Sequence, residues 1–104
     1  MIRNAFTMKL KPGNVEEYKK RHDEIWPELS KELADAGVFD YSIYFDEESL
    51  TLFAFQKLTD DNTADNLKNL EIVQKWWAHM EDLMETHPNN VPVVKPLREV
   101  FHMD

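Results

Sequence analysis

The chain has 104 residues, of which 42% are hydrophobic and none is cysteine, and its formal net charge is -8. This length predicts a single domain, residues 1–104, with one modest core, and the lack of thiols excludes disulfides and thiolate metal sites. The acidic charge argues against nucleic acid and membranes as partners, because both present phosphate; with no apolar run of about 20 residues to span a bilayer, we expect a cytoplasmic protein.

The chain begins with a segment that alternates between apolar and polar residues. From Ile2 to Leu10 this alternation predicts a half-buried strand, which Pro12-Gly13 then ends. Asn14, with Glu17 three residues later, has the form of a helix cap with a reciprocal acidic partner. We therefore expect a helix from Val15 onward.

Pro27 divides this helical segment. Proline has no backbone N–H, and its ring crowds the carbonyl four residues earlier, so we expect a kink or a break near residues 23–27. The helical pattern resumes through Leu29 and continues to Ala36. Gly37 then predicts the end of the helix, because glycine readily adopts the left-handed conformation found there.

Two alternating segments follow, residues 39–45 and 50–58, separated by the polar residues 46–49. Their spacing predicts a β-hairpin. Large apolar side chains fall on both of its faces, since Tyr44 and Phe55 point opposite to Ile43 and Ala54. Both faces of the sheet therefore need cover.

A second helical region is expected after residues 59–62 and before Asn89. Its predicted inward stripe consists of Leu67, Leu70, Val73, Trp77, Met80 and Met84. Residues 97–102 alternate again and predict a fourth strand. The resulting order, strand-helix-strand-strand-helix-strand, predicts an α+β, ferredoxin-like βαββαβ fold: a four-stranded antiparallel sheet with two helices on one face. The bare face then predicts a homodimer.

The segment from Tyr18 to Glu28 concentrates aromatic and ionisable side chains around one imidazole. His22 lies on the inward stripe of the predicted helix, with Tyr18, Ile25, Trp26 and Leu29 at three- and four-residue steps. Two interpretations remain open. His22 is either a hydrogen-bonded histidine of a small core, or a proton-transfer residue at a pocket wall, because its reference pKa of about 6.5 suits both giving and taking protons.

The pair Trp76-Trp77 is the second unusual feature. Neighbouring helical side chains point about 100° apart, so both cannot occupy one core stripe. We expect Trp77 in the core and Trp76 either at an edge or in an aromatic wall for a sugar ring, with hydroxyls from Tyr18 and Tyr41. The remaining histidines lack the spacing of a zinc motif and no glycine-rich phosphate loop exists, so neither a metal nor a cofactor is expected.

These features together resemble the L-rhamnose mutarotase family. The resemblance is carried by Tyr18 to Glu28 with Arg21-His22 and Ile25-Trp26-Pro27-Glu28, by Tyr41-Ser42-Ile43-Tyr44, by Trp76-Trp77 with Met80 and Met84, and by Glu99-Val100-Phe101-His102. It implies a ferredoxin-like dimer, a dimeric α/β barrel, that interconverts the α and β anomers of L-rhamnose without a cofactor. It further implies that His22 is the proton donor and that Tyr18, Tyr41, Trp76 and Trp77 line the sugar site.

The fold alone leaves other functions open. Cofactor-independent monooxygenases and haem-binding dimers use the same architecture, as do small proteins with no catalytic activity. A non-catalytic module that binds a small ligand is therefore a third hypothesis. Binding of a visible chromophore would favour the haem binder, and saturable ligand binding without sugar exchange would favour the binding module.

Overall fold

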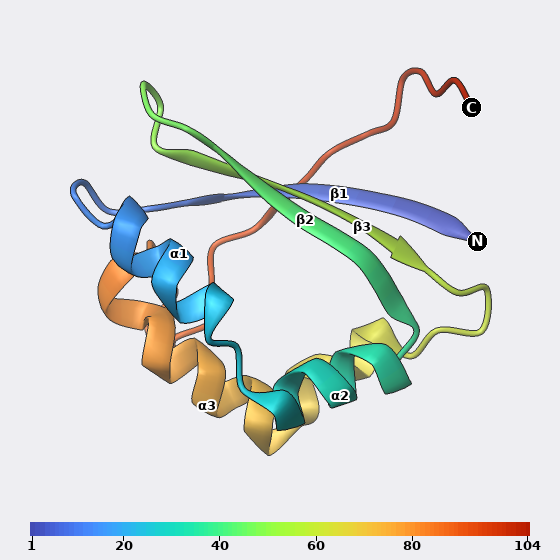
Figure 1. The fold of residues 1–104 in the computed structure, drawn as a ribbon, viewed down its shortest axis with the longest axis horizontal. Helices are drawn as coiled ribbons and strands as arrows, with labels where there is room; N and C mark the ends of the chain where they lie inside the picture. The colour runs from blue at the N-terminus through green and yellow to red at the C-terminus, as the bar shows by residue number, and fades with distance from the viewer.

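The computed structural model describes all 104 residues and places a four-stranded antiparallel sheet over a layer of helices. Figure 1 shows the helices on one side of the sheet. The elements are β1 (Ile2–Lys9), α1 (Val15–Asp23), α2 (Pro27–Asp35), β2 (Val38–Asp46), β3 (Thr51–Leu58), the 3-10 helix η1 (Ala64–Asn69), α3 (Glu71–Met80), the 3-10 helix η2 (Glu81–Leu83) and β4 (Lys95–Pro96). The strand order β2-β3-β1-β4 is that of the predicted ferredoxin-like fold, so the fold prediction is confirmed.

The core lies between the helices and the face of the sheet that we call the inner face. In the central pair of strands, Met8 lies opposite Leu52, and Phe6 lies opposite Ala54. Leu52 and Ala54 are at most 1% exposed. The core also takes buried side chains from every helical element except η1: Tyr18, Leu29, Val73, Trp76, Met80 and Leu83. Period-two alternation in the strands thus positions one apolar face for the helices to cover.

Pro27 breaks the first helical segment completely. Helix α1 ends at Asp23, and Pro27 is the first residue of α2, a position where a missing N–H costs nothing. Trp26 before it has an extended backbone, as expected for a residue that precedes proline. The predicted break is therefore confirmed. The chain turns there, and Trp26, which lies between α1 and α2, packs against the core.

The predicted cap of α1 is wrong, although the helix does begin at Val15. Asn14 makes no side-chain capping bond and instead donates its amide to the carbonyl of Lys11 at 3.2 Å. The side chain thus stabilises the preceding turn, which is the usual alternative for asparagine near a helix start.

The second helical region is not continuous, which corrects the predicted stripe. Leu70 has an extended backbone and separates η1 from α3. Of the predicted stripe, Val73, Met80 and Met84 are buried, and Leu67 and Leu70 are partly buried against the core. The buried side chains of α3 are Val73, Trp76 and Met80, whereas Trp77 is only half-buried at the margin of the core. The expectation that Trp77, rather than Trp76, occupies the core is wrong.

The predicted fourth strand, residues 97–102, is also wrong. Strand β4 consists of Lys95 and Pro96 alone, which pair with β1. Beyond it the chain has no regular secondary structure and leaves Val100, Phe101 and Met103 between 77% and 82% exposed. The backbone hydrogen bonds to β1 end with the bond from the Leu97 amide to the Ala5 carbonyl, so the alternating residues that follow form no strand.

The outer face of the sheet carries exposed aromatic side chains. Tyr44 and Phe55 lie there as the hairpin pattern predicted, and the shift in pairing after Phe39 places Phe39 there too. Phe39, Tyr44 and Phe55 are 44%, 66% and 45% exposed. Tyr44 and Phe55 are 6.0 Å apart in an edge-on arrangement. The helices cover only the inner face, so these rings have no cover within the chain. None of the helices has the length and apolar character required to span a membrane.

Candidate functional site

The imidazole of His22 is held by its own helix. His22 lies in the last turn of α1, half-buried, and its Nδ1 is 3.0 Å from the carbonyl oxygen of Tyr18. A carbonyl can only accept a hydrogen bond, so Nδ1 must carry the proton. The bond fixes both the orientation of the ring and its tautomer. In the neutral ring, the Nε2 atom therefore has a free lone pair.

Two aromatic rings enclose the imidazole. Tyr18 stacks on His22 with ring centroids 4.3 Å apart and an interplanar angle of 28°. Trp76 meets it edge-on at 5.4 Å and 86°. Tyr18 and Trp76 are only 6% and 8% exposed, so they form a rigid wall on two sides of the ring. His22 itself keeps intermediate exposure, so these two rings do not enclose it completely.

Burial controls the charge of this imidazole. It lowers the pKa of His22 below its ordinary value, and the hydrogen bond to the Tyr18 carbonyl and the nearby Asp23 charge only partly offset that effect. His22 is therefore neutral near pH 7. A neutral imidazole with Nδ1 protonated can accept a proton at Nε2 and later return it.

Tyr41 lies on the inner face, two residues before Ile43, beside a bulge in β2. The pairing of β2 with β3 shifts between Phe39 and Ser42, and Asp40 within that shift has a positive φ of 47°. The ring of Tyr41 lies 6.5 Å from that of Phe6, which belongs to the inner face. The side chain remains 39% exposed, so it borders open space.

The two tyrosine hydroxyls near the site keep their protons. Burial, and secondarily the neighbouring Tyr41, raises the pKa of Tyr18 well above its ordinary value. Burial of the hydroxyl end raises the pKa of Tyr41 to about 12, although part of its ring is exposed. Both groups are therefore neutral hydrogen-bond donors near pH 7.

The five residues expected at the site are thus only partly brought together. Tyr18, His22 and Trp76 are in direct contact, and Tyr41 reaches the neighbourhood of Tyr18 from the sheet. Trp77 makes no ring contact with His22 and packs at the margin of the core.

Two further residues complete the aromatic cluster. Trp26 lies edge-on to Trp76 at 5.1 Å, and the ring of His79 lies 5.3 Å from Trp26 and 5.5 Å from Trp76. The sequence pattern identified Trp26 as an inward residue, but it carried no signal for His79, which is exposed on its helix. No group of three or more histidine, aspartate or glutamate residues is arranged to hold a metal ion.

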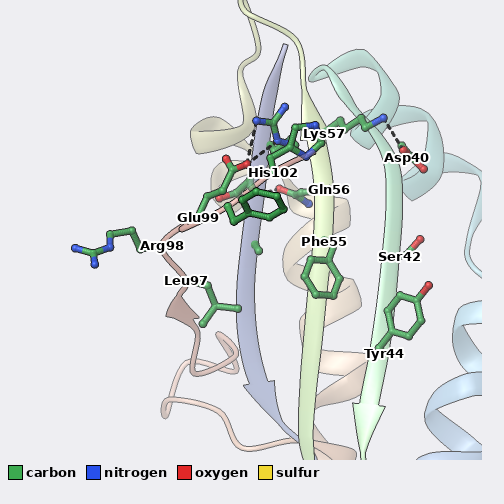
Figure 2. Close-up of a pocket in the computed structure, with 14 residues that line it drawn as sticks. Asp40, Ser42, Tyr44, Phe55, Gln56, Lys57, Leu97, Arg98, Glu99 and His102 are labelled. Atoms are coloured by element: carbon green, nitrogen blue, oxygen red, sulfur yellow. Dashed lines mark hydrogen bonds and ion pairs between the residues drawn. The ribbon is translucent and has the colours of Figure 1, made fainter. Parts of the chain in front are cut away.

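A cavity of about 570 Å³ lies on the outer face of the sheet, away from this cluster. It contains none of the five expected site residues. Figure 2 shows Tyr44 and Phe55 projecting from the strands, with Glu99 and His102 of the C-terminal segment beside them. Ion pairs join Arg3 to Glu99 at 2.9 Å and Lys57 to Asp40 at 3.0 Å. The cavity is open and is lined by aromatic side chains and paired charges. None of its acid/base residues is fixed by a helix carbonyl between two aromatic rings, as His22 is.

The comparisons with known proteins agree with one another. A family model described as L-rhamnose mutarotase matches residues 3–103. The chain belongs to the L-rhamnose mutarotase family. A relative named L-rhamnose mutarotase in Bacteroides thetaiotaomicron is 58% identical, and one of the same name in Phocaeicola vulgatus is 55% identical; in each case the alignment covers 100% of both chains.

A solved structure supports the same conclusion. The crystal structure of an L-rhamnose mutarotase from Formosa agariphila aligns over 100% of both chains with a TM-score of 0.93 and 53% identity. This relative therefore shares the architecture of the chain as well as its sequence.

The environment of His22 predicts how it titrates. Because burial lowers the pKa, the ring should titrate below the reference value of about 6.5 in an NMR pH titration of its carbon-bound protons. The unfolded chain then binds more protons than the folded one between these two pKa values. The free energy of unfolding should therefore fall as the pH drops from about 6.5 through the pKa of His22. Titration of His22 at or above the reference value would contradict this description of the site.

Proposed function

We propose that the protein is an L-rhamnose mutarotase, an isomerase that interconverts the α and β anomers of L-rhamnopyranose in rhamnose metabolism. Membership of the family over the whole chain supports the reaction and the substrate. The observation that supports the site is the His22 imidazole, pinned through Nδ1 and enclosed by Tyr18 and Trp76. Mutarotation needs an acid/base group held in this way.

The reaction moves two protons and breaks one bond. A proton leaves the anomeric hydroxyl, the bond between C1 and the ring oxygen breaks, and a proton arrives at the ring oxygen. The open-chain aldehyde turns about its bond to C2, and the reverse steps close the ring in either anomeric form. During ring opening His22 takes the anomeric proton at Nε2 and then gives a proton to the ring oxygen, and during ring closure it makes the reverse transfers, so the imidazole is neutral again after each step. The exchange is redox-neutral, so the proposal includes neither a metal nor a cofactor.

The aromatic residues would hold the sugar. The edge of Trp76 and the ring of Tyr18 lie beside His22, and aromatic faces accept both the C–H face of a sugar and the methyl group of a 6-deoxy sugar. The hydroxyls of Tyr18 and Tyr41 stay protonated and can donate hydrogen bonds to sugar oxygens. Trp77, which lies one position further on α3, is included as a substrate contact on the family resemblance alone.

Removal of the imidazole tests the proposed catalyst. His22→Ala should slow anomer exchange by about a hundredfold to ten-thousandfold, the usual contribution of one positioned acid/base group. Saturation-transfer NMR on the anomeric protons of L-rhamnose measures the exchange rate directly. His87→Ala, which changes an exposed histidine outside the cluster, is the matched control and should exchange at the wild-type rate.

Two results would contradict the proposal in different ways. Wild-type protein that leaves the exchange at its uncatalysed rate, yet shows saturable sugar binding, would make the protein a binding module. A His22→Ala variant as fast as wild type would mean that the protein is a mutarotase but that His22 takes no part in the reaction.

We also propose that the protein acts as a cytoplasmic homodimer in which two sheets pack through their outer faces into an α/β barrel. The exposed rings of Phe39, Tyr44 and Phe55 support this arrangement, because the helices of one chain cover only the inner face. Recovery of the native protein from a secreted or membrane fraction would contradict the location.

The dimer predicts a particle of twice the 12.4 kDa chain mass in light scattering at micromolar concentration. A charged side chain in the outer face should dissociate it, since Tyr44→Glu would bury an unpaired carboxylate between the sheets. Lys31→Glu, at an exposed position on α2, is the matched control. A wild-type particle of single-chain mass would contradict the dimer.

A further inference from the structure

Arg21, the residue before His22, is unlike the other basic residues of α1. Its side chain is 17% exposed, whereas that of Lys19 is 72% exposed. Its Nη1 donates to the backbone carbonyl of His79 at 2.6 Å and to Asp82 Oδ1 at 2.8 Å, and Nη2 donates to Asp82 Oδ2 at 3.2 Å. Its Nε donates to Glu17 at 2.8 Å. One guanidinium therefore connects α1 with the end of α3 and with η2.

These bonds close a circuit of contacts around the proposed catalytic group. Arg21 holds the backbone of His79, and the ring of His79 lies 5.5 Å from that of Trp76. Trp76 in turn meets His22 at 5.4 Å, and His22 follows Arg21 in the chain. Helix α1, which carries His22, and helix α3, which carries Trp76, are thus joined both by the bond from Arg21 to the His79 backbone and by the contact between the two rings.

The charges of this contact are stable across the physiological pH range. The hydrogen bonds to Asp82, and then to Glu17, raise the pKa of Arg21, and the hydrogen bond from Arg21 lowers the pKa of the Asp82 carboxyl. Both partners stay ionised, which favours the short two-pronged geometry of a guanidinium and a carboxylate. The ion pair between Arg21 and Asp82 therefore stays formed through the pH range in which His22 titrates.

We propose that Arg21 is a positioning residue of the mutarotase, which clamps α1 to the end of α3 through His79 and Asp82 and so sets the His22 imidazole against the Trp76 indole. This inference rests on the proposed function of His22. Arg21 touches no reacting atom in it and acts through the placement of its neighbour. Rates respond steeply to such placement, because a displacement of about 1 Å can cost about a hundredfold.

The geometry requires arginine rather than any cation. The planar guanidinium presents donors in two directions at once, toward Asp82 and His79 on one side and toward Glu17 on the other. A lysine ammonium is a single charge on a flexible stem and cannot reproduce this fork. Of the two acidic partners, only Asp82 lies in a different element, since Glu17 belongs to α1 itself.

This asymmetry provides the experiment. Asp82→Ala breaks the link between elements, Arg21→Lys keeps the charge but not the fork, and Glu17→Gln, the matched control, removes a charge from the same guanidinium without separating the helices. Each variant is assayed by anomer exchange of L-rhamnose where circular dichroism shows it folded. Asp82→Ala and Arg21→Lys should lose about tenfold to a hundredfold in kcat with a smaller change in KM, whereas Glu17→Gln should stay within about twofold of wild type.

The ring of His22 gives a second readout that is independent of activity. In Asp82→Ala and Arg21→Lys its NMR resonances and its titration midpoint should move, and in Glu17→Gln they should not. The double variant Arg21→Lys/Asp82→Ala should lose little more than either single variant, since the two residues form one contact.

Three results would overturn the inference. Wild-type kcat and unshifted His22 resonances in Asp82→Ala, with only a lower melting temperature, would reduce the clamp to a stabilising ion pair. Equal losses in Glu17→Gln would assign the effect to α1 as a whole. If the wild type itself catalyses no exchange, the proposed function fails, and unmoved His22 resonances in Asp82→Ala would show separately that the positioning is wrong.

Discussion

The hydrogen bond from Nδ1 of His22 to the carbonyl of Tyr18 is the contact on which the proposed chemistry of this protein depends. It spans one turn of α1, so it forms wherever the helix forms, and it leaves Nε2 as the only basic atom of a neutral ring. Burial by Tyr18 and Trp76 then keeps that ring neutral. A free imidazole in water has neither constraint: it rotates, and its two nitrogens exchange roles.

The rest of the fold fixes the position of α1, which one short helix cannot do alone. Helix α1 has 9 residues, which is too short to be stable alone, so its position depends on the packing of Tyr18 and on the bonds of Arg21. The break at Pro27 turns the chain so that Trp26 lies against Trp76. The inner face of the sheet adds Tyr41 from β2. Each of these devices fixes an aromatic or acid/base group relative to its neighbours.

Much of the architecture could be predicted from local sequence, because local rules determine it. Alternation in β1, β2 and β3, the position of Pro27 and the left-handed Gly37, whose φ is 92°, all follow from the immediate neighbours of each residue. The inward orientation of His22 follows from the 3.6-residue period of α1 in the same way.

What could not be predicted depends on distant contacts. In α3 the buried residue after Val73 is three positions on rather than four, a choice that packing makes and that the apolar pattern leaves open, and this interchanged the expected roles of Trp76 and Trp77. The partners of Arg21 outside α1 lie 58 and 61 residues away, so its sequence neighbourhood gave no indication of them. The C-terminal segment alternates, but its strand pairing with β1 involves only Lys95 and Pro96, so β4 stays at 2 residues.

The central claim is that L-rhamnose reacts on the inner side of the sheet, at His22, and not in the cavity of the outer face. Isotope-filtered NOE measurements on the labelled protein with unlabelled L-rhamnose test this directly. We predict contacts from the anomeric proton of the sugar to the ring protons of His22 and Trp76. Contacts to Tyr44 and Phe55 instead, with none to His22, would contradict it.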